Sequence, residues 1–325
     1  MNFFGLDIGG TKCAVSRLRP DGSVEETHRI TTGGAEGTIG ALLSSVATLA
    51  PGSDPVFGIS CGGPLDLARG LILSPPNLPG WDRIPITETV TRRFGGRAVL
   101  MNDANASALA EWRFGAGRGC RHMVFLTSGT GMGAGLILNG QLYEGASGDA
   151  GEVGHIRLSD TGPVGFGKAG SFEGFCSGGG IPKLAAQMLG SKPMPAAWLD
   201  RGAVSTRAIA GAALAGDMLS LRVLEEAGRY LGKALSILID TLNPERIVIG
   251  GIFPRCQALL EPAMRAELEH ETLPTPLASC HIAPAELGET IGSHGAISAA
   301  LHAFPAVARS LPNYNGNYNQ PAASA

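Results

Sequence analysis

Glycine and threonine stand together at two places where a short loop could bind phosphate. The first is residues 7–12 (DIGGTK) and the second is residues 129–131 (GTG), each between two apolar runs. Glycine lets backbone N–H groups approach a phosphate closely, and the threonine hydroxyl adds a donor. Glycine pairs are also common in ordinary hairpin turns, so each loop by itself admits a purely structural explanation.

Two polar residues close the stretch that begins with the second loop. Glu152 and His155 stand three residues apart at the end of residues 126–155. A carboxylate accepts charge-assisted hydrogen bonds from neighbouring hydroxyls, so this pair suits a polyhydroxylated ligand. A stretch that combines a phosphate loop with hydroxyl ligands favours transfer of a phosphoryl group onto such a ligand.

A carboxylate with the position of a catalytic base follows another apolar run. Residues 97–101 (RAVLM) predict a buried strand, Asn102 and Asp103 come directly after it, and residues 104–112 have helical spacing. Strand ends of this kind face the ligand crevice in α/β sheets, so Asp103 could take a proton from a substrate hydroxyl. Asp is also a favoured helix N-cap, which is the structural alternative for the same residue.

A long loop rich in glycine and proline lies between these features. Residues 61–86 carry Ser74, Asn77, Trp81 and Asp82. Loops this long inside a compact domain are usually functional, and polar side chains beside an aromatic plane suit one wall of a sugar site. A surface loop covered by Trp81 is the alternative.

The order of the expected elements is the same in both halves of the chain. Each half begins with a strand, a Gly-Thr turn, a second strand and a third, as an antiparallel meander. The longest expected helix covers residues 217–242 and ends at Asn243-Pro244, and a strand at residues 246–249 runs into Gly250-Gly251. Two such halves would place the two Gly-Thr loops on either side of one nucleotide.

Composition excludes several functional classes. The chain has 325 residues, a net charge of −3 and no block of like charges, so no basic stripe for a nucleic acid is expected. Its six cysteines contain no CxxC pair, which argues against a disulfide framework and a zinc ribbon. No signal peptide and no apolar run of membrane-spanning length is visible. We therefore expect a soluble cytoplasmic protein without a nucleic-acid or membrane partner.

Seven motifs together resemble one known family. They are LDIGGTK, GGPLD, NLPGW, NDANASALAE, TSGTGMGAG, EVGH and FEGFCSG, spread over residues 3 to about 300. This set resembles the ROK family of bacterial sugar kinases. The resemblance implies an α/β protein with the two-lobed actin-like ATPase and sugar kinase fold, in which each lobe is a mixed sheet with flanking helices. The expected lobes are residues 1–116 plus 290–304 and residues 117–289, followed by a disordered tail at 305–325.

Carried over position by position, the resemblance implies three groups of site residues. Asp103 would be the catalytic base. Sugar hydroxyls would be held by Gly63, Asn77, Asn102, Asp103, Glu152, His155 and Glu173. The nucleotide would be bound by Asp7, Gly9, Gly10, Thr11, Lys12, Gly129, Thr130, Gly131, Gly250 and Gly251. Asp7 would also hold Mg²⁺, directly or through water.

The sequence departs from the family at its zinc site. Most members place three cysteines before the last of these motifs, and those cysteines bind zinc with the histidine. The corresponding positions hold Val164, Phe166 and Ser171. Because His155 alone does not form a closed tetrahedral site, we expect no structural zinc. We expect the loop to be packed by Phe166 and Phe172 instead.

The implied function is ATP-dependent phosphorylation of a hexose, with glucose at its 6-hydroxyl as the first choice. An N-acetylhexosamine (GlcNAc or ManNAc) or another hexose is the alternative substrate, and polyphosphate is an alternative donor. The family also contains sugar-responsive repressors, but the first phosphate loop begins at Asp7, which leaves no room for a preceding DNA-binding domain. A non-catalytic sugar-sensing protein is the alternative of another class. The family resemblance suggests a homodimer.

Overall fold

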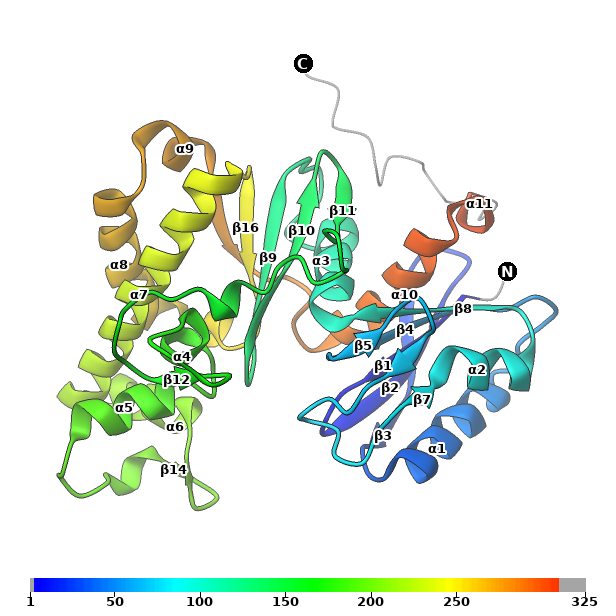
Figure 1. Ribbon diagram of the computed structural model, residues 1–325, viewed down its shortest axis with the longest axis horizontal. Coiled ribbons are helices and arrows are strands. Elements are labelled where there is room, and N and C mark those ends of the chain that lie inside the picture. Colours follow the sequence, from blue (N-terminus) through cyan, green and yellow to red (C-terminus); the bar gives the residue numbers. More distant parts are fainter. Residues whose placement is uncertain (1–2, 310–325) are drawn as a thin grey trace. The chain divides into compact units, whose positions relative to one another are not determined.

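The computed structural model describes residues 3–309, which divide into two compact units (Figure 1). Unit 1 contains residues 3–119, 140–142 and 286–309, and unit 2 contains residues 120–139 and 143–285. The lobe boundaries 116/117 and 289/290 that the sequence suggested stay predictions.

Unit 1 is built on a five-stranded mixed sheet. Its strand order is β3-β2-β1-β4-β8. The strands are β1 (Phe3–Ile8), β2 (Lys12–Leu18), β3 (Val24–Thr31), β4 (Val56–Cys61) and β8 (Arg97–Asn102). Strands β1 to β3 form the antiparallel meander that the sequence predicted, whereas β1, β4 and β8 are parallel. Every residue of β4 is buried, as is typical of a central parallel strand.

The helices of unit 1 come from both ends of the chain. They are α1 (Ala35–Thr48), α2 (Ile86–Phe94), α3 (Asp103–Phe114), α10 (Ile291–Ala303) and α11 (Pro305–Ala308). Helix α10 packs directly on β1 and β4. A Cβ built on Gly58 of β4 would lie 1.9 Å from the carbonyl oxygen of Ala296, so glycine is what allows this close contact. Short elements join these parts: β5 (Leu65–Asp66), β6 (Leu71–Ile72), β7 (Ile84–Pro85) and the 3₁₀ turn Gly288–Thr290.

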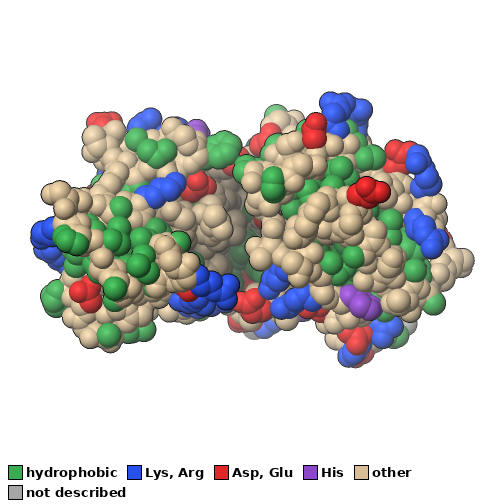
Figure 2. Space-filling model, turned by 90° about the horizontal axis from the view of Figure 1, so that it is seen from below, with side chains coloured by type: hydrophobic (Ala, Val, Ile, Leu, Met, Phe, Trp, Pro, Cys, Tyr) green, Lys and Arg blue, Asp and Glu red, His purple; other side chains and the backbone are tan. Residues whose placement is uncertain are grey.

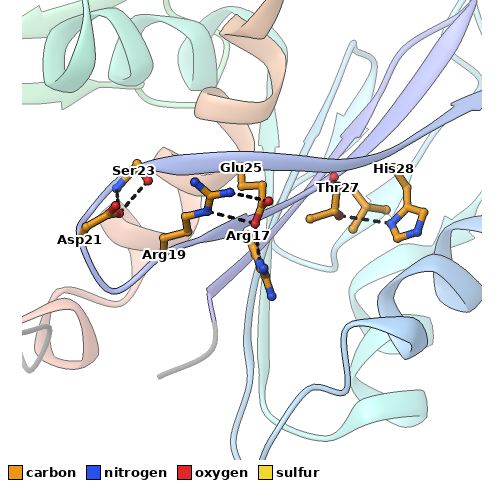
Figure 3. A network of polar contacts seen from close by, with 8 residues as sticks. Arg17, Arg19, Asp21, Ser23, Glu25, Thr27 and His28 are labelled. Carbon is orange, nitrogen blue, oxygen red and sulfur yellow. Dashed lines mark hydrogen bonds and ion pairs between the residues drawn. The ribbon is translucent and has the colours of Figure 1, made fainter.

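An ionic network covers the outer hairpin of this sheet (Figure 3). Glu25 of the edge strand β3 accepts hydrogen bonds from Arg17 at 2.7 Å and from Arg19 at 2.6 Å. The guanidiniums of Arg19 and Arg17 lower the pKa of Glu25 to about 2. Asp21 accepts from the backbone N–H of Ser23 and fixes the turn between the strands. Charged side chains on an edge strand discourage pairing with a second sheet.

Unit 2 repeats the strand order of unit 1. Its sheet runs β11-β10-β9-β16-β17. The strands are β9 (Met123–Ser128), β10 (Met132–Leu138), β11 (Gln141–Tyr143), β16 (Arg246–Ile249) and β17 (His281–Pro284). Strand β10 is antiparallel to β9, whereas β16 and β17 continue parallel to it. The glycine loops after β1 and after β9 therefore occupy equivalent positions in the two sheets, as the sequence predicted.

Residues 120–285 form six α-helices, and all of these except the last contribute buried residues to the core of unit 2. They are α4 (Phe172–Cys176), α5 (Ile181–Leu189), α6 (Thr206–Leu214), α7 (Met218–Leu242), α8 (Phe253–Glu271) and α9 (Pro274–Ser279). Asp217 caps α7, and Asn243 ends it in the left-handed conformation, which confirms the helix predicted there. Gly228 and Gly232 face the carbonyl oxygens of Leu260 and Met264 in α8, so the two helices pack closely.

The remaining elements of unit 2 are short. They are the 3₁₀ turns η1 (Val153–His155) and η2 (Ala196–Trp198), and two hairpins, β12 (Val164–Gly165) with β13 (Lys168–Ala169) and β14 (Leu199–Asp200) with β15 (Ala203–Val204). No helix among residues 3–309 is long and apolar enough to span a membrane.

The start of the segment predicted to be disordered is helical. Residues 305–308 form α11, because Ala308 is buried in the apolar cluster that also contains Phe3, Ile297 and Leu301. Residues 310–325 of the predicted tail lie outside the described part of the chain. On the face drawn in Figure 2, positive and negative side chains of the described residues are interspersed rather than gathered in one field.

Candidate functional site

The first glycine loop lies against the long loop of unit 1. A Cβ built on Gly10 would lie 2.5 Å from the carbonyl oxygen of Asn77, so only glycine fits there. Thr32 accounts for two carbonyl groups of the loop: its hydroxyl donates to Gly9 at 2.6 Å and its N–H to Thr11 at 3.1 Å. With those carbonyls bound, a phosphate beside the loop meets donors rather than acceptors.

Four predicted site residues of unit 1 gather around Gly62, the residue after β4. A Cβ built on Gly62 would lie 3.6 Å from an Asp103 carboxylate oxygen and 3.7 Å from Asn77 Nδ2. On the neighbouring Gly63, a Cβ would lie 3.8 Å from Asn102 Nδ2. The structure therefore brings Gly63, Asn77, Asn102 and Asp103 together.

The helix cap next to Asp103 is Asn102. The Oδ1 atom of Asn102 accepts from the N–H of Ala104 at 2.9 Å and of Asn105 at 3.4 Å. Asp103 is the first residue of α3. The alternative that Asp103 is the N-cap is therefore wrong, because the preceding amide already satisfies the helix N–H groups. Asn102 is thus the side chain that caps α3, although the backbone N–H groups of Ala104 and of Asp103 itself also interact with the Asp103 carboxylate.

Burial raises the pKa of both acidic residues in this group. Asp7 has a pKa of about 6, raised first by burial and then by the negative charge of Asp103, while Lys12 opposes the rise. A Cβ on Gly292 of α10 would lie 2.0 Å from the Asp7 carboxylate, which shows how tightly it is enclosed. Asp103 exposes part of its surface, yet the surrounding protein raises its pKa above the ordinary value by removing water. Lys12 itself pairs with Glu289 at 3.2 Å.

Asp7→Asn is expected to stabilise the protein at pH 7.5. The folded pKa of about 6 exceeds the ordinary 3.8, so the folded state binds the proton more tightly. Stability from this group is present at low pH and is lost as pH rises through about 6. We expect the thermal unfolding midpoint of the variant to exceed the wild type by about 2–4 °C at pH 7.5. The difference should shrink towards pH 4.5, and a less stable variant at pH 7.5 would contradict the assignment.

The second glycine loop is held between two other segments of unit 2. The backbone N–H of Gly178 donates to the carbonyl of Gly129 at 2.7 Å, and that of Gly179 donates to Thr130 at 3.0 Å. As in the first loop, neighbouring groups take up the carbonyls. Sequence reasoning missed this role of Gly178 and Gly179, although the run Ser177–Gly180 (SGGG) was its visible signal.

Gly251 touches the same loop from the other side. It has φ +67°, and a Cβ there would lie 1.9 Å from the carbonyl oxygen of Ser128. The N–H of Ile252 donates to that carbonyl at 2.8 Å. Gly251 therefore lies next to the phosphate loop, and the predicted nucleotide contact of Gly250 and Gly251 stays a prediction. Their glycine identity already follows from packing, without a nucleotide.

Glu173 and the turn with Glu152 and His155 meet at Met132, directly after the loop. Glu173 Oε2 accepts from the N–H of Met132 at 3.1 Å. A Cβ on Gly154, in the middle of η1, would lie 2.1 Å from the Met132 carbonyl oxygen. Glu152 and His155 flank Gly154 and are both exposed. Unit 2 thus places Glu173, and the turn that carries Glu152 and His155, beside the residue that directly follows its phosphate loop.

Trp81 is not part of a binding wall. It is fully buried, and its indole N–H donates to the carbonyl of Gly33 at 3.1 Å. The aromatic plane that the sequence suggested for a sugar site is therefore wrong for this residue, because the loop folds it into the core of unit 1. Asn77 of the same loop is exposed beside the glycine loop.

The positions that hold zinc-binding cysteines in most relatives do not fit a metal. Val164 and Phe166 have no donor atom, and Phe166 is 79% exposed at the turn of its hairpin. Ser171 is fully buried, and its hydroxyl accepts from the N–H of Gly174 at 3.2 Å. Among residues 3–309 no group of three or more His, Cys, Asp or Glu side chains could hold a metal ion. Phe172 is buried as expected, but the predicted packing of Phe166 is wrong because the turn points it outward.

Magnesium is compatible with the acidic residues of unit 1. Asp7 and Asp103 are two carboxylates whose mutual repulsion contributes to the raised pKa of Asp7. A hard cation prefers oxygen ligands and would relieve that repulsion.

Comparison with known proteins places these features in a family. The sequence model of the ROK family matches residues 3–303. A glucokinase of Thermotoga maritima is 30% identical over 308 residues, which cover 92% of this chain and 96% of the relative. The crystal structure of a ROK family glucokinase from Streptomyces griseus, in complex with glucose and AMPPNP, is 32% identical with a TM-score of 0.73 and covers 92% of this chain and 98% of its own.

A regulator is also similar. The crystal structure of a ROK family transcriptional regulator, a homologue of the E. coli MLC protein, has a TM-score of 0.79 and 25% identity. The alignment covers 93% of this chain and 78% of the regulator.

The fold is the actin-like ATPase and sugar kinase fold predicted from the sequence. The family match, the relatives and the two glycine loops agree: the chain belongs to the ROK family.

Proposed function

We propose that this protein is a sugar kinase that transfers the γ-phosphoryl group of ATP to a hexose, with glucose at its 6-hydroxyl as the preferred acceptor. The observation that carries the proposal is the position of Asp103. Its carboxylate lies at the start of α3, close to Asn77 and Gly62. The cap of this helix is Asn102 rather than Asp103. The similarity to glucokinases supports the choice of acceptor.

In this proposal Asp103 accepts the proton of the sugar hydroxyl as that oxygen attacks the γ-phosphorus. A base works best when its pKa lies near the working pH, and burial moves the pKa of Asp103 upward in that direction. The positive end of α3 and the backbone N–H of Ala104 act in the opposite sense and limit this rise of the pKa.

The two glycine loops are assigned to the phosphates. In unit 1, Gly10 and Thr11 would present donors to phosphate oxygens, and in unit 2 Thr130 and Gly131 would do the same. Bound magnesium supplies further neutralisation of that charge, and Asp7 is the residue that would hold it. Lys12 would exchange its pairing with Glu289 for a phosphate.

Unit 2 is assigned the recognition of the sugar ring through Glu152, His155 and Glu173. Carboxylates that accept from sugar hydroxyls contribute roughly 1.5–3 kcal/mol for each hydrogen bond to a charged group. A site built from them rejects sugars that lack the matching hydroxyl, because the carboxylate would be left unpaired. N-acetylhexosamines share these hydroxyls except the one at C2, which an acetamido group replaces, and they are therefore the alternative acceptors.

The test is a coupled ADP-release assay over glucose, mannose, N-acetylglucosamine and N-acetylmannosamine. We expect the highest kcat/KM with glucose and no sugar-dependent release with 6-deoxyglucose, which lacks the accepting hydroxyl. A parallel series with polyphosphate instead of ATP identifies the donor. Absence of sugar-dependent ADP release with every sugar would refute the proposal.

A non-catalytic sugar-sensing protein is the second candidate, favoured by the similarity to a transcriptional regulator. Calorimetric titration separates the two, since a sensor binds sugar without any turnover of ATP. We place the protein in the cytoplasm because its six cysteines are free thiols, five of them buried. A homodimer remains a prediction from the family resemblance.

A further inference from the structure

The hairpin of β12 and β13 is fastened to the backbone of His155 by a lysine. Lys168 of β13 donates from Nζ to the carbonyl oxygen of His155 at 2.8 Å. Arg157 donates to the carbonyl of Ala169 at 2.9 Å and forms a β-bridge with Ser171. The chain on both sides of His155 is therefore tied to the hairpin and to the residues that follow it.

The hairpin of β12 and β13 is itself held by other parts of unit 2, so Lys168 can fix the position of the His155 backbone. Lys183 of α5 donates from Nζ to the carbonyl of Val164 at 2.7 Å. A Cβ on Gly165 would lie 2.6 Å from the N–H of Gly174, so β12 also lies directly on α4. Lys168 thus reaches His155 from a hairpin whose other strand, β12, contacts two helices.

The same segment sets the position of Glu173. Ser171, fully buried, caps α4 by accepting from Gly174, and the N–H of Phe172 donates to the carbonyl of Ile156 at 2.9 Å. Glu173 lies in the first turn of α4 and bonds Met132. One continuous segment therefore links the two candidate sugar ligands His155 and Glu173.

We infer that Lys168 is a positioning residue for His155, and that this lysine-fastened hairpin does without metal what zinc does in most relatives. A zinc ion joins a histidine to three cysteines, whereas here an ammonium joins the histidine backbone to the hairpin at the corresponding place. The ring of His155 also meets Phe166 edge-on, with ring centroids 6.3 Å apart. The role of His155 as a sugar ligand rests on the proposed function. The hydrogen bond by which Lys168 holds the His155 backbone does not depend on it.

The experiment compares Lys168→Met, Lys168→Arg and the control Lys192→Met, an exposed lysine of the same unit. We expect Lys168→Met to raise the KM for glucose about 10-fold, with kcat and the KM for ATP changed less than about 2-fold, because one charge-assisted hydrogen bond is lost. Lys168→Arg keeps a donor and should restore the glucose KM. Lys192→Met should behave as wild type. An unchanged glucose KM in Lys168→Met, or a defect that Lys168→Arg fails to restore, overturns the inference.

Two measurements do not depend on turnover. Hydrogen exchange of a peptide covering residues 153–157 should become faster in Lys168→Met but not in Lys192→Met. The purified wild type should contain no stoichiometric zinc, and a zinc-selective chelator should leave its thermal unfolding midpoint unchanged. Stoichiometric zinc, a chelator-induced fall in the midpoint or unchanged exchange overturns the inference. If no sugar supports ADP release, the proposed function fails. Hydrogen exchange and zinc content still test whether Lys168 holds the His155 segment without a metal.

Discussion

Asp103→Asn is expected to lower kcat by about 10²–10⁴-fold, the usual contribution of a general base. The amide has nearly the same shape but cannot accept the proton of the attacking hydroxyl. Because Asn102 supplies the helix cap, α3 should keep its start and the fold should be unaffected. Glucose should still bind, with an affinity within a few fold of wild type by calorimetry.

The matched control is Asp54→Asn, the same change on an exposed carboxylate of unit 1. It should leave kcat, KM and the unfolding midpoint unchanged. Asp54 has φ +53°, which Asn tolerates well, so no backbone strain is introduced. Turnover of Asp103→Asn close to that of the control would remove Asp103 from the role of base.

Glu111→Ala is expected to destabilise unit 1 by about 3–5 kcal/mol, because three backbone N–H groups lose their acceptor and an unsatisfied donor costs about 1–3 kcal/mol. Glu111 is fully buried in α3. Its carboxylate accepts from the N–H groups of Ala116 at 2.8 Å, Glu286 at 3.2 Å and Leu287 at 2.9 Å. Alanine leaves these three donors without their acceptor, and the hydrogen bond from Ala116 is buried while the other two are partly buried.

Glu111→Gln separates shape from hydrogen bonding. Glutamine retains one acceptor oxygen but turns its NH2 group towards the remaining N–H groups. The free energy of unfolding of this variant should therefore lie between those of the wild type and Glu111→Ala. Glu88→Gln, on an exposed face where Glu88 pairs with Arg92, should change stability by less than about 0.5 kcal/mol. Urea unfolding monitored separately in each unit is the measurement, since two units need not unfold together. Equal stability of Glu111→Ala and wild type would show that water satisfies these donors.

Local pattern was enough to predict the elements and the glycine loops. The meander from Phe3 to Thr31 and the helix ending at Asn243 follow from alternation, periodicity and terminators, which are properties of neighbouring residues. The strand followed by Asn102 and Asp103 was likewise legible as the end of a parallel strand.

Contacts between distant segments were not predictable in this way. The bonds from Thr32 to Gly9, and from Gly178 to Gly129, join residues far apart in sequence through their backbones, which leave no mark on residue type. Whether Asn102 or Asp103 caps α3 depends on the residue at which the helix begins. A shift of the helix start by one residue would exchange their roles, and the sequence does not define the start that finely. Phe166 was expected inside because it is apolar, but its φ of +42° in a tight turn points the ring outward.

The chain order of unit 1 has a consequence for synthesis on the ribosome. Unit 2 lies within residues 120–285, interrupted only by residues 140–142, whereas the core of unit 1 joins Phe3 and Val56 to Ile297 and Leu301. The first 119 residues therefore emerge from the ribosome without α10, the helix that packs on β1 and β4. They stay without it until all of unit 2 has been translated. We therefore expect unit 2 to complete its fold first, the reverse of the usual order in which the N-terminal part folds ahead of the rest.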